Sequence, residues 1–219
     1  MYSYTEENYL KAIYKLQELK GEAINTNSIA SAMDTKAASV TDMIKKLSDK
    51  KLLKYQKYKG VQLTETGKRI AIDTVRKHRL WETFLHNKLS FTWDEVHEIA
   101  EQLEHIRSKD LVDRLDKYLG YPTHDPHGDP IPMSNGVIKT SNFILLSEMA
   151  AGESGIISGV VNHSSLFLQH LQKNELILGK NIRVLEIHDF DLSLQIEIEK
   201  KKNIQVSNEV ARNILVKDK

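Results

Sequence analysis

The 219-residue sequence contains no cysteine, only four prolines and no long run of apolar residues. The absence of cysteine excludes disulfides and thiolate metal sites. Because spanning a bilayer takes about 18 consecutive apolar residues, no membrane-spanning segment is expected. The first residues, MYSYTEENYL, contain neither the basic nor the apolar stretch of a secretory signal. We therefore expect a cytoplasmic protein.

The composition is that of a globular protein, with 40% hydrophobic and 28% charged residues. The net charge of +1 conceals an uneven distribution. Residues 1–70 hold 13 Lys and Arg against 8 Asp and Glu, whereas residues 71–140 hold 9 against 12. A basic first third followed by an acidic middle is typical of a DNA-contacting module joined to a cation-binding module.

Apolar spacing and turn residues predict three domains, over residues 1–72, 73–140 and 141–219. The predicted fold class is mainly α with a small β part: a winged helix-turn-helix, a helical domain and a C-terminal SH3-like β-barrel. Helices are predicted at 5–19, 26–33, 37–49, through 69–87, at 92–107 and 108–119, at 165–174 and at the terminal segment 208–216. Short strands are predicted on both sides of Lys59-Gly60 and at 155–161, 181–187 and 193–199.

The predicted helices at 26–33 and 37–49, joined by a tight turn and followed by a basic hairpin, describe a winged helix-turn-helix. The second helix is expected to enter the major groove of DNA. Its small side chains permit close approach, and its hydroxyls can bond phosphates or bases. The predicted DNA-contacting residues of this helix are Thr35, Lys36, Ala37, Ala38, Ser39, Thr41 and Asp42. The predicted phosphate-contacting residues of the wing are Lys54, Lys57 and Lys59. A winged helix that binds only protein is the alternative.

Glu101, Glu104 and His105 are spaced at i, i+3 and i+4, with His97 one turn upstream. On a helix these side chains share one face, where the carboxylates would repel each other unless a cation lay between them. A divalent metal ion is the expected cation. The i, i+4 pair His78 and Glu82 forms a second candidate site with His97, provided that the two helices pack antiparallel.

Nitrogen and oxygen donors without sulfur suit Mn(II), Fe(II) or Zn(II), and the abundance of carboxylates favours Mn(II). In the proline-rich segment 121–132, His124, Asp125 and His127 are either turn residues or auxiliary ligands. From the residues alone, two alternatives stay beside a metal-activated regulator. One is a metallohydrolase, and the other is a metal-independent DNA-binding protein whose acidic cluster only makes salt bridges.

Several segments occur in the order seen in one known family: ENYLKAIYKL, SVTDMIKKLSDKKLLKY, LTETGKRIA, RKHRLWETFL, EIAEQLEHIRS and HGDPIP. With these segments the chain resembles the diphtheria toxin repressor and manganese transport regulator family, and its C-terminal part is similar to the SH3-like (FeoA-type) domain of the longer members. The resemblance implies a homodimeric, metal-activated repressor of metal-uptake genes that binds palindromic double-stranded DNA. An iron-dependent repressor of the same family is the alternative.

The resemblance also implies metal ligands. Its primary site falls on Asn8, Glu101, Glu104 and His105, and its second site on His78, Glu82 and His97. In a streptococcal-type variant of the family the second site instead uses Glu82, Asp125, His127 and His163. Glu101 is the manganese-type residue, whereas Asn8 replaces the usual Asp and Lys11 the Glu of short members. The C-terminal domain could supply ligands, stabilise the dimer or bind the proline segment.

Overall fold

The computed structural model describes residues 2–20, 23–56, 60–139 and 142–218. The chain forms two compact units. One unit comprises Met1–His78, Glu101–Arg114 and Pro132–Ile138, and the other comprises Arg79–Ala100, Leu115–Ile131 and Lys139–Lys219. Among the described helices, none has the length and apolar character that a bilayer crossing requires.

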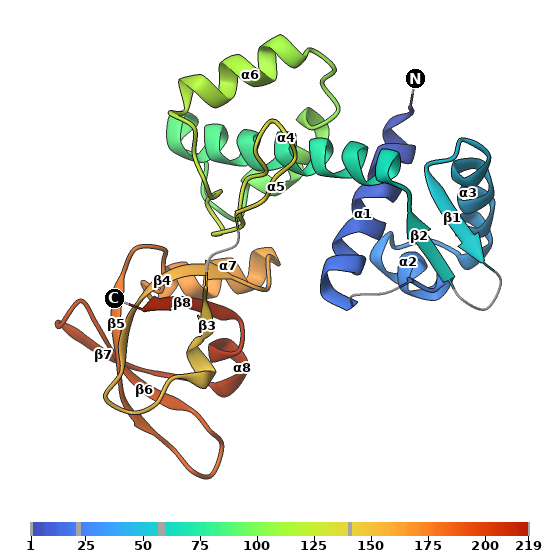
Figure 1. The fold of residues 1–219 in the computed structure, drawn as a ribbon. Coiled ribbons are helices and arrows are strands. Elements are labelled where there is room, and N and C mark those ends of the chain that lie inside the picture. Colours follow the sequence, from blue (N-terminus) through green and yellow to red (C-terminus); the bar gives the residue numbers. More distant parts are fainter. Residues whose placement is uncertain (1, 21–22, 57–59, 140–141, 219) are drawn as a thin grey trace. The chain divides into compact units, whose positions relative to one another are not determined.

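The first unit contains the predicted winged helix-turn-helix (Figure 1). Its elements are α1 (Tyr4–Lys20), α2 (Thr26–Ala32), α3 (Ala37–Asp49), β1 (Leu53–Gln56) and β2 (Gly60–Leu63). The Asn25 side chain caps α2 by accepting a hydrogen bond from the Ser28 amide. Apolar faces of α1 and α3 form the core, and α3 has the bounds that its spacing predicts. The core residues of these two helices include Tyr9, Leu10, Ile13, Val40, Ile44 and Leu47.

Three further helices follow: α4 (Glu65–Leu89), α5 (Val96–Leu103) and α6 (Lys109–Tyr118). The predicted helix at 92–107 is too long at both ends. The Glu95 carboxylate accepts a hydrogen bond from the Thr92 amide, but a turn precedes the helix, which begins at Val96. Since α5 ends at Leu103, Glu104 and His105 lie in the following turn and not on a shared helical face.

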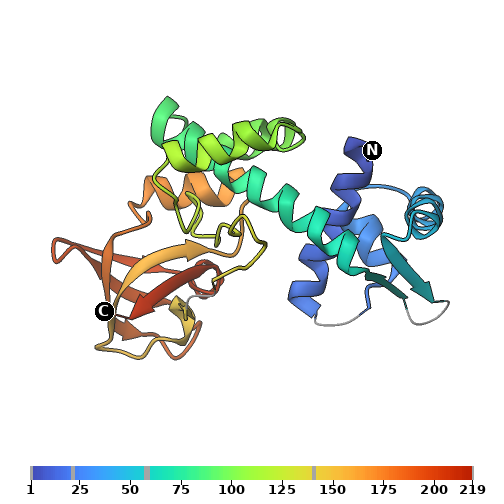
Figure 2. The ribbon, with the colours of Figure 1, turned by 45° about the horizontal axis from the view of Figure 1, so that its top comes forward.

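The C-terminal part of the second unit, coloured gold to red in Figure 2, contains an antiparallel sheet. The order of its six strands is β3-β8-β4-β5-β6-β7. The strands are β3 (Ile144–Leu145), β4 (Ser154–Val160), β5 (Asn181–Ile187), β6 (Leu194–Ile198), β7 (Lys202–Val206) and β8 (Ile214–Asp218). The short helices are η1 (Leu146–Glu148), α7 (Ser165–Lys173) and α8 (Asn208–Ala211). Leu168 and Leu171 of α7 belong to the same core as the sheet residues Ile157, Val184 and Ile196.

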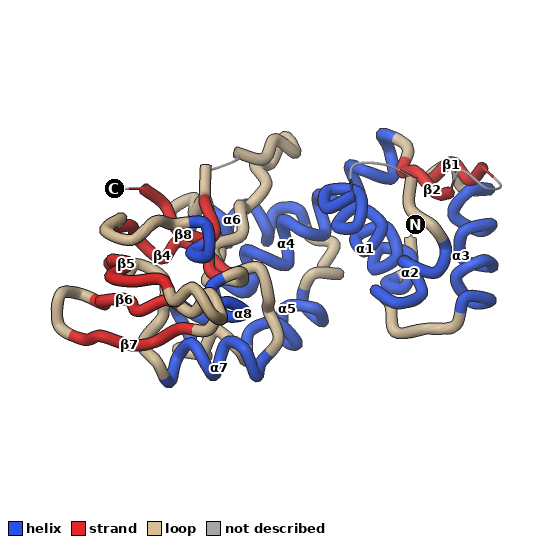
Figure 3. Tube along the Cα trace, turned by 90° about the horizontal axis from the view of Figure 1, so that it is seen from below, coloured by secondary structure: helices blue, strands red, loops and turns tan. Residues whose placement is uncertain are grey.

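The predicted terminal helix at 208–216 is wrong in its second half. The helix ends at Ala211, and the next residues form β8 between β3 and β4. Ile214 and Val216 are fully buried and two residues apart, which is the spacing of a strand with one buried face. Between α6 and β3 the described residues form a long loop (Figure 3), which includes the isolated bridge between His124 and Pro130.

Candidate metal centre and nucleic-acid interface

Glu82 of α4 and two residues of the long loop, Asp125 and His127, form a buried cluster in the second unit. Their exposed fractions are 2%, 5% and 1%. One donor atom from each residue lies within 4.8 Å of the donor atoms of the others. Two carboxylates and one imidazole at this separation form a donor set for a divalent metal ion, without any thiolate.

Hydrogen bonds shape the loop that carries two of these residues. Asp125 Oδ1 accepts bonds from the His127 amide (2.8 Å) and the Asp129 amide (3.0 Å), which closes an Asx turn. Arg79 donates to the Pro130 carbonyl at 2.6 Å and to the Asp129 carboxylate at 3.0 Å. The helix α4 therefore fixes the loop through Arg79 and supplies the third donor through Glu82.

Two buried donor atoms of the cluster, Asp125 Oδ2 and His127 Nδ1, have no partner within hydrogen-bond distance among the described residues. Their ion-pair partners lie farther away, with Arg79 Nε 3.7 Å from Asp125 Oδ2 and Glu82 Oε2 3.6 Å from His127 Nδ1. His127 Nε2 lies 2.6 Å from the Trp93 carbonyl oxygen. Because a carbonyl only accepts, Nε2 donates, and in the neutral ring Nδ1 keeps its lone pair. Buried polar atoms are normally satisfied, so these two atoms fit a metal ion that would bind them.

The electrostatics of the cluster also favour a cation. Burial, together with the charges of Glu82 and Asp129, raises the pKa of the Asp125 carboxyl. Burial acts to lower the pKa of His127, but Glu82 and Asp125 outweigh it and the pKa is raised. Both shifts show an excess of negative charge in a desolvated space, where positive charge is stabilised.

Of the other residues assigned to the second site, His163 stacks on His127 with ring centroids 4.9 Å apart. Its Nε2 lies 3.2 Å from the Val160 carbonyl oxygen. The Nδ1 atom of His97 is 3.2 Å from the Oε1 atom of Glu82. The third residue of that predicted set, His78, places its Nδ1 2.6 Å from Glu104 Oε2 in the first unit.

The C-terminal sheet holds the metal-site loop. The Val160 amide of β4 donates to the His127 carbonyl at 2.9 Å. A Cβ atom on Gly128, which has a φ of +88°, would lie 2.1 Å from the Ser158 carbonyl oxygen and 2.4 Å from Gly159 Cα. Only glycine permits this approach. The loop and the sheet are therefore packed backbone to backbone directly beside His127.

The residues of the predicted primary site occupy the first unit, where Lys11 of α1 lies among the carboxylates. Its Nζ is 2.6 Å from Glu101 Oε1 and 2.7 and 2.8 Å from the two oxygens of Glu104. The Lys11 ammonium group therefore contacts both of the carboxylates for which a divalent metal ion was predicted.

His105 and Asn8, the other two predicted primary-site ligands, have separate surroundings. His105 Nδ1 lies 2.6 Å from Glu7 Oε2, and its ring stacks on Tyr4 at 4.5 Å. Asn8 Oδ1 is buried, and no described residue hydrogen-bonds to it. Glu7 and Arg79 carry no recognisable signal in the sequence, because each contacts residues far along the chain and a charged residue is ordinary on a helix surface.

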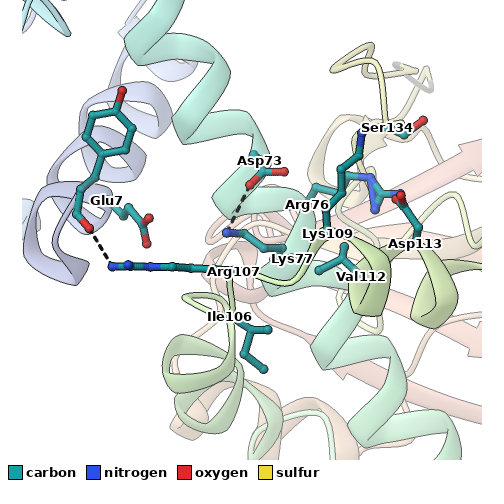
Figure 4. A pocket seen from close by; sticks show the side chains of 11 residues that line it. Glu7, Asp73, Arg76, Lys77, Ile106, Arg107, Lys109, Val112, Asp113 and Ser134 are labelled. Atoms are coloured by element: carbon teal, nitrogen blue, oxygen red, sulfur yellow. Dashed lines mark hydrogen bonds and ion pairs between the residues drawn. The ribbon is translucent and has the colours of Figure 1, made fainter.

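A cavity of about 320 Å³ lies beside Glu7 in the first unit (Figure 4). At its wall Arg107 donates to the Tyr2 carbonyl, and Lys77 pairs with Asp73 at 3.2 Å. The lining carries both cationic and acidic side chains. It therefore differs from the cluster of Glu82, Asp125 and His127, which combines carboxylates with an imidazole.

The predicted DNA-contacting end of α3 is accessible. Thr35 and Thr41 are half-buried, and the Thr41 hydroxyl donates to the Ala37 carbonyl at 2.9 Å. The other residues of this end are exposed: Lys36, Ala37, Ala38, Ser39 and Asp42. On the wing Lys54 is exposed on β1, whereas Lys57 and Lys59 lie outside the described residues.

Family models match most of the chain. A model of the N-terminal DNA-binding domain of iron-dependent repressors matches residues 1–61. A model of the metal-binding and dimerisation domain of the same proteins matches residues 64–133. A FeoA domain model matches residues 144–218.

Individual proteins are similar over much of their length. The iron-dependent repressor IdeR of Mycobacterium tuberculosis (strain ATCC 25618 / H37Rv) is 36% identical over 155 residues, which cover 68% of this chain and 67% of that protein. A solved manganese-dependent transcriptional repressor in complex with manganese is 32% identical, with a TM-score of 0.86 over 98% of this chain and 100% of that one. The structure of ScaR with bound Cd²⁺ is 36% identical, with a TM-score of 0.79 over 98% and 99% of the two chains.

Proposed function

Because the chain belongs to the iron-dependent repressor family, we propose that it is a manganese-activated transcriptional repressor of metal-uptake genes. It binds palindromic double-stranded DNA as a homodimer in the cytoplasm. Residues 1–72 bind DNA, residues 73–140 bind metal and dimerise, and residues 141–219 support the metal site.

The cluster of Glu82, Asp125 and His127 carries this proposal. It combines three buried donors with two buried atoms that no described residue hydrogen-bonds. Manganese is favoured because hard carboxylate oxygens predominate. When bound, the ion supplies positive charge that offsets the two carboxylates of this desolvated cluster. The hydrogen bonds from Arg79 to the loop and the close packing of Gly128 on the sheet hold the three metal-binding side chains together without a bound ion.

At the DNA-binding end, the exposed first turn of α3 reads the major groove and Lys54 contacts a phosphate. Lys57 and Lys59 are proposed to act in the same way. Repression follows if metal binding narrows the range of positions that the recognition helices of the dimer sample, which is allosteric linkage between two distinct sites. By reciprocity, DNA then raises the affinity for metal by the same factor.

At the predicted primary site, which comprises Asn8, Glu101, Glu104 and His105, the Lys11 ammonium group already balances the carboxylates. We therefore assign activation to Glu82, Asp125 and His127, with His97 and His163 as neighbouring imidazoles. His78 acts through its bond to Glu104 and not as an activating ligand.

The test is a titration of DNA binding with Mn(II), monitored by fluorescence anisotropy on a duplex that the Mn(II)-loaded protein selects from a random library. The substitutions Glu82→Gln and Asp125→Asn keep the size of each side chain and remove its negative charge. The asparagine also keeps an Oδ1 atom that can accept the hydrogen bonds from the loop amides. Each should raise the half-saturating Mn(II) concentration by about tenfold or more, the loss typical of a metal-site change. Exposed Glu209→Gln is the charge-matched control. Equal titration curves for all four proteins would exclude this site.

Parallel titrations with Fe(II) and Zn(II), with metal counted per chain, identify the activating ion. An Fe(II) response at lower concentration than the Mn(II) response would favour the iron-dependent alternative, which the likeness to IdeR supports. Hydrolysis of a phosphodiester or peptide substrate by the Mn(II)-loaded protein would instead favour a metallohydrolase. Light scattering of the DNA complex determines whether two chains bind one duplex.

A further inference from the structure

Glu6 is a fully buried carboxylate in the first turn of α1, within the first unit. Its Oε1 and Oε2 accept hydrogen bonds from Lys50 Nζ at 2.7 and 2.9 Å, and Lys46 Nζ lies 3.0 Å from Oε1. The Ser3 amide donates to Oε2 at 3.0 Å. The side chain of Glu6 is 0% exposed, although Lys46 and Lys50 are partly exposed.

Both lysines belong to the end of the recognition helix. Lys46 lies in the last turn of α3 and Lys50 is its C-cap residue. Because they are spaced at i and i+4, the two lysines share one helical face. They lie at the C-terminal end of α3, whereas the exposed first turn that is proposed to contact DNA is at its N-terminal end. The Glu6 carboxylate thus binds α3 at the end that does not read bases.

The same turn of α1 also contacts His105. Glu7, the next residue, lies with its carboxylate Oε2 2.6 Å from His105 Nδ1 and accepts a hydrogen bond from this ring nitrogen, and Tyr4 stacks on the ring. Adjacent side chains of α1 therefore face two different partners, the recognition helix through Glu6 and the turn after α5 through Glu7. A rotation of α1 at this turn would be transmitted to both.

Burial acts to raise the pKa of Glu6, but the bonds from Lys50, Ser3 and Lys46 outweigh it and lower the pKa to about 2. Its contacts with the two lysines and with the Ser3 amide are all direct. In some proteins a buried ion pair fixes a specific conformation, and removing one partner of such a pair is strongly destabilising.

We propose that Glu6 is a positioning residue for DNA recognition, which sets the orientation of α3 against α1 by holding Lys46 and Lys50. The inference rests on the proposed function, since α3 must be the DNA-reading helix. A helix rises about 1.5 Å per residue, so a small rotation at Lys50 displaces the base-reading turn more than ten residues away. Glu6 affects DNA binding only through this displacement and does not itself contact DNA.

The experiment measures operator affinity of the full-length, Mn(II)-loaded protein for the selected duplex. Glu6→Gln should weaken binding at least tenfold, while Mn(II) affinity without DNA stays within twofold of the unchanged protein. Lys50→Gln should also weaken binding, and by more than Lys45→Gln, which removes the same charge from an exposed position of α3. The Glu6→Gln, Lys50→Gln double variant should be no weaker than the worse single variant, because both remove one link.

Three results would overturn the proposal. One is an unchanged DNA affinity in Glu6→Gln accompanied by a lower unfolding temperature, which would show a purely structural role. The second is tighter binding with a steeper salt dependence, which would show that Glu6 only withholds the lysines from phosphates. The third is equal loss in Lys50→Gln and Lys45→Gln, a comparison that holds even if Glu6→Gln fails to fold. If Mn(II) does not strengthen DNA binding by the unchanged protein, the metal-activation proposal fails separately.

Discussion

Lys11 Nζ lies 2.7 and 2.8 Å from the two carboxylate oxygens of Glu104, and both side chains are buried. This bond joins α1 to the turn after α5 within the first unit. A charge-assisted hydrogen bond of this kind is shorter and stronger than one between neutral groups. Its consequence is that the carboxylates at 101 and 104, which would otherwise call for a metal ion, have a cation from the chain itself.

Lys11→Gln is expected to open this cluster to metal. Removing the ammonium group leaves Glu101 and Glu104 without their shared cation, so divalent ions should bind there and raise the number of Mn(II) ions per chain by one. Loss of one partner of a buried pair costs about 3–5 kcal/mol, so the metal-free variant should also unfold more readily. Metal analysis after gel filtration and calorimetric titration measure the stoichiometry.

Lys45→Gln serves as the control for this experiment, because Lys45 is exposed and pairs only weakly, at 3.9 Å, with Asp42. Its metal count and stability should match those of the unchanged protein. If the unchanged protein already binds as many Mn(II) ions as Lys11→Gln, the ammonium group does not exclude metal and the assignment to Lys11 is wrong.

Gly128→Ala should loosen the metal-site loop. Its Cβ atom would overlap the Ser158 carbonyl oxygen, and its φ of +88° disfavours any side chain. We expect a loss of about 3 kcal/mol in unfolding free energy, from overpacking and backbone strain together, and weaker Mn(II) binding. Chemical denaturation and metal titration give the two values.

Gly152→Ala is the matched control for the glycine substitution. Gly152 has a similar φ of +93°, but a Cβ atom there would meet nothing within 4 Å. The Gly152→Ala substitution should therefore lower the free energy of unfolding only by the backbone strain, about 1–2 kcal/mol, and leave the metal affinity unchanged. A Gly128→Ala protein that behaves like Gly152→Ala would show that the close packing of the loop is unimportant.

Local patterns predicted the winged helix well because each signal is short-range. The residues Val40, Ile44 and Leu47 recur over about two helical turns, and all three are buried in the structure. The terminal segment was misassigned because α8 is a real but very short helix, and only pairing with distant β3 and β4 decides that Ile214 begins a strand.

The candidate sites show the same limit. His127 and Asp125 were identified as possible ligands from a proline-rich loop, but their partner Glu82 lies more than forty residues earlier in the chain. Long-range contacts such as the one between Lys11 and Glu104, 93 residues apart, leave no periodic signature. A lysine at a helical position reads as solvent-facing unless its distant neighbours are known.

The exposed Lys54 of the wing should contribute to DNA affinity through counterion release. Lys54→Gln is expected to weaken binding to all duplexes by a similar factor and to reduce the slope of log K against log salt by about 1. Binding isotherms at several salt concentrations give the slope. Lys173→Gln, on the exposed surface of α7, should leave both quantities unchanged, and an equal change in both variants would argue against a specific phosphate contact.

The low pKa of Glu6 predicts an acid-dependent loss of stability. Burial alone would raise this pKa, but bonds from Lys50, Ser3 and Lys46 lower it from 4.5 to about 2. A carboxyl group whose folded-state pKa is depressed stabilises the fold above its unfolded value, and that contribution is lost as the pH falls from about 4.5 towards 2. Glu6→Gln has no charge to titrate at this position. The difference in unfolding free energy between the unchanged protein and Glu6→Gln should therefore be constant from pH 6 to pH 8 and shrink progressively below pH 4.5. Urea denaturation at each pH measures it, and a difference that stays constant down to pH 3 would show that the ionised carboxylate does not stabilise the fold.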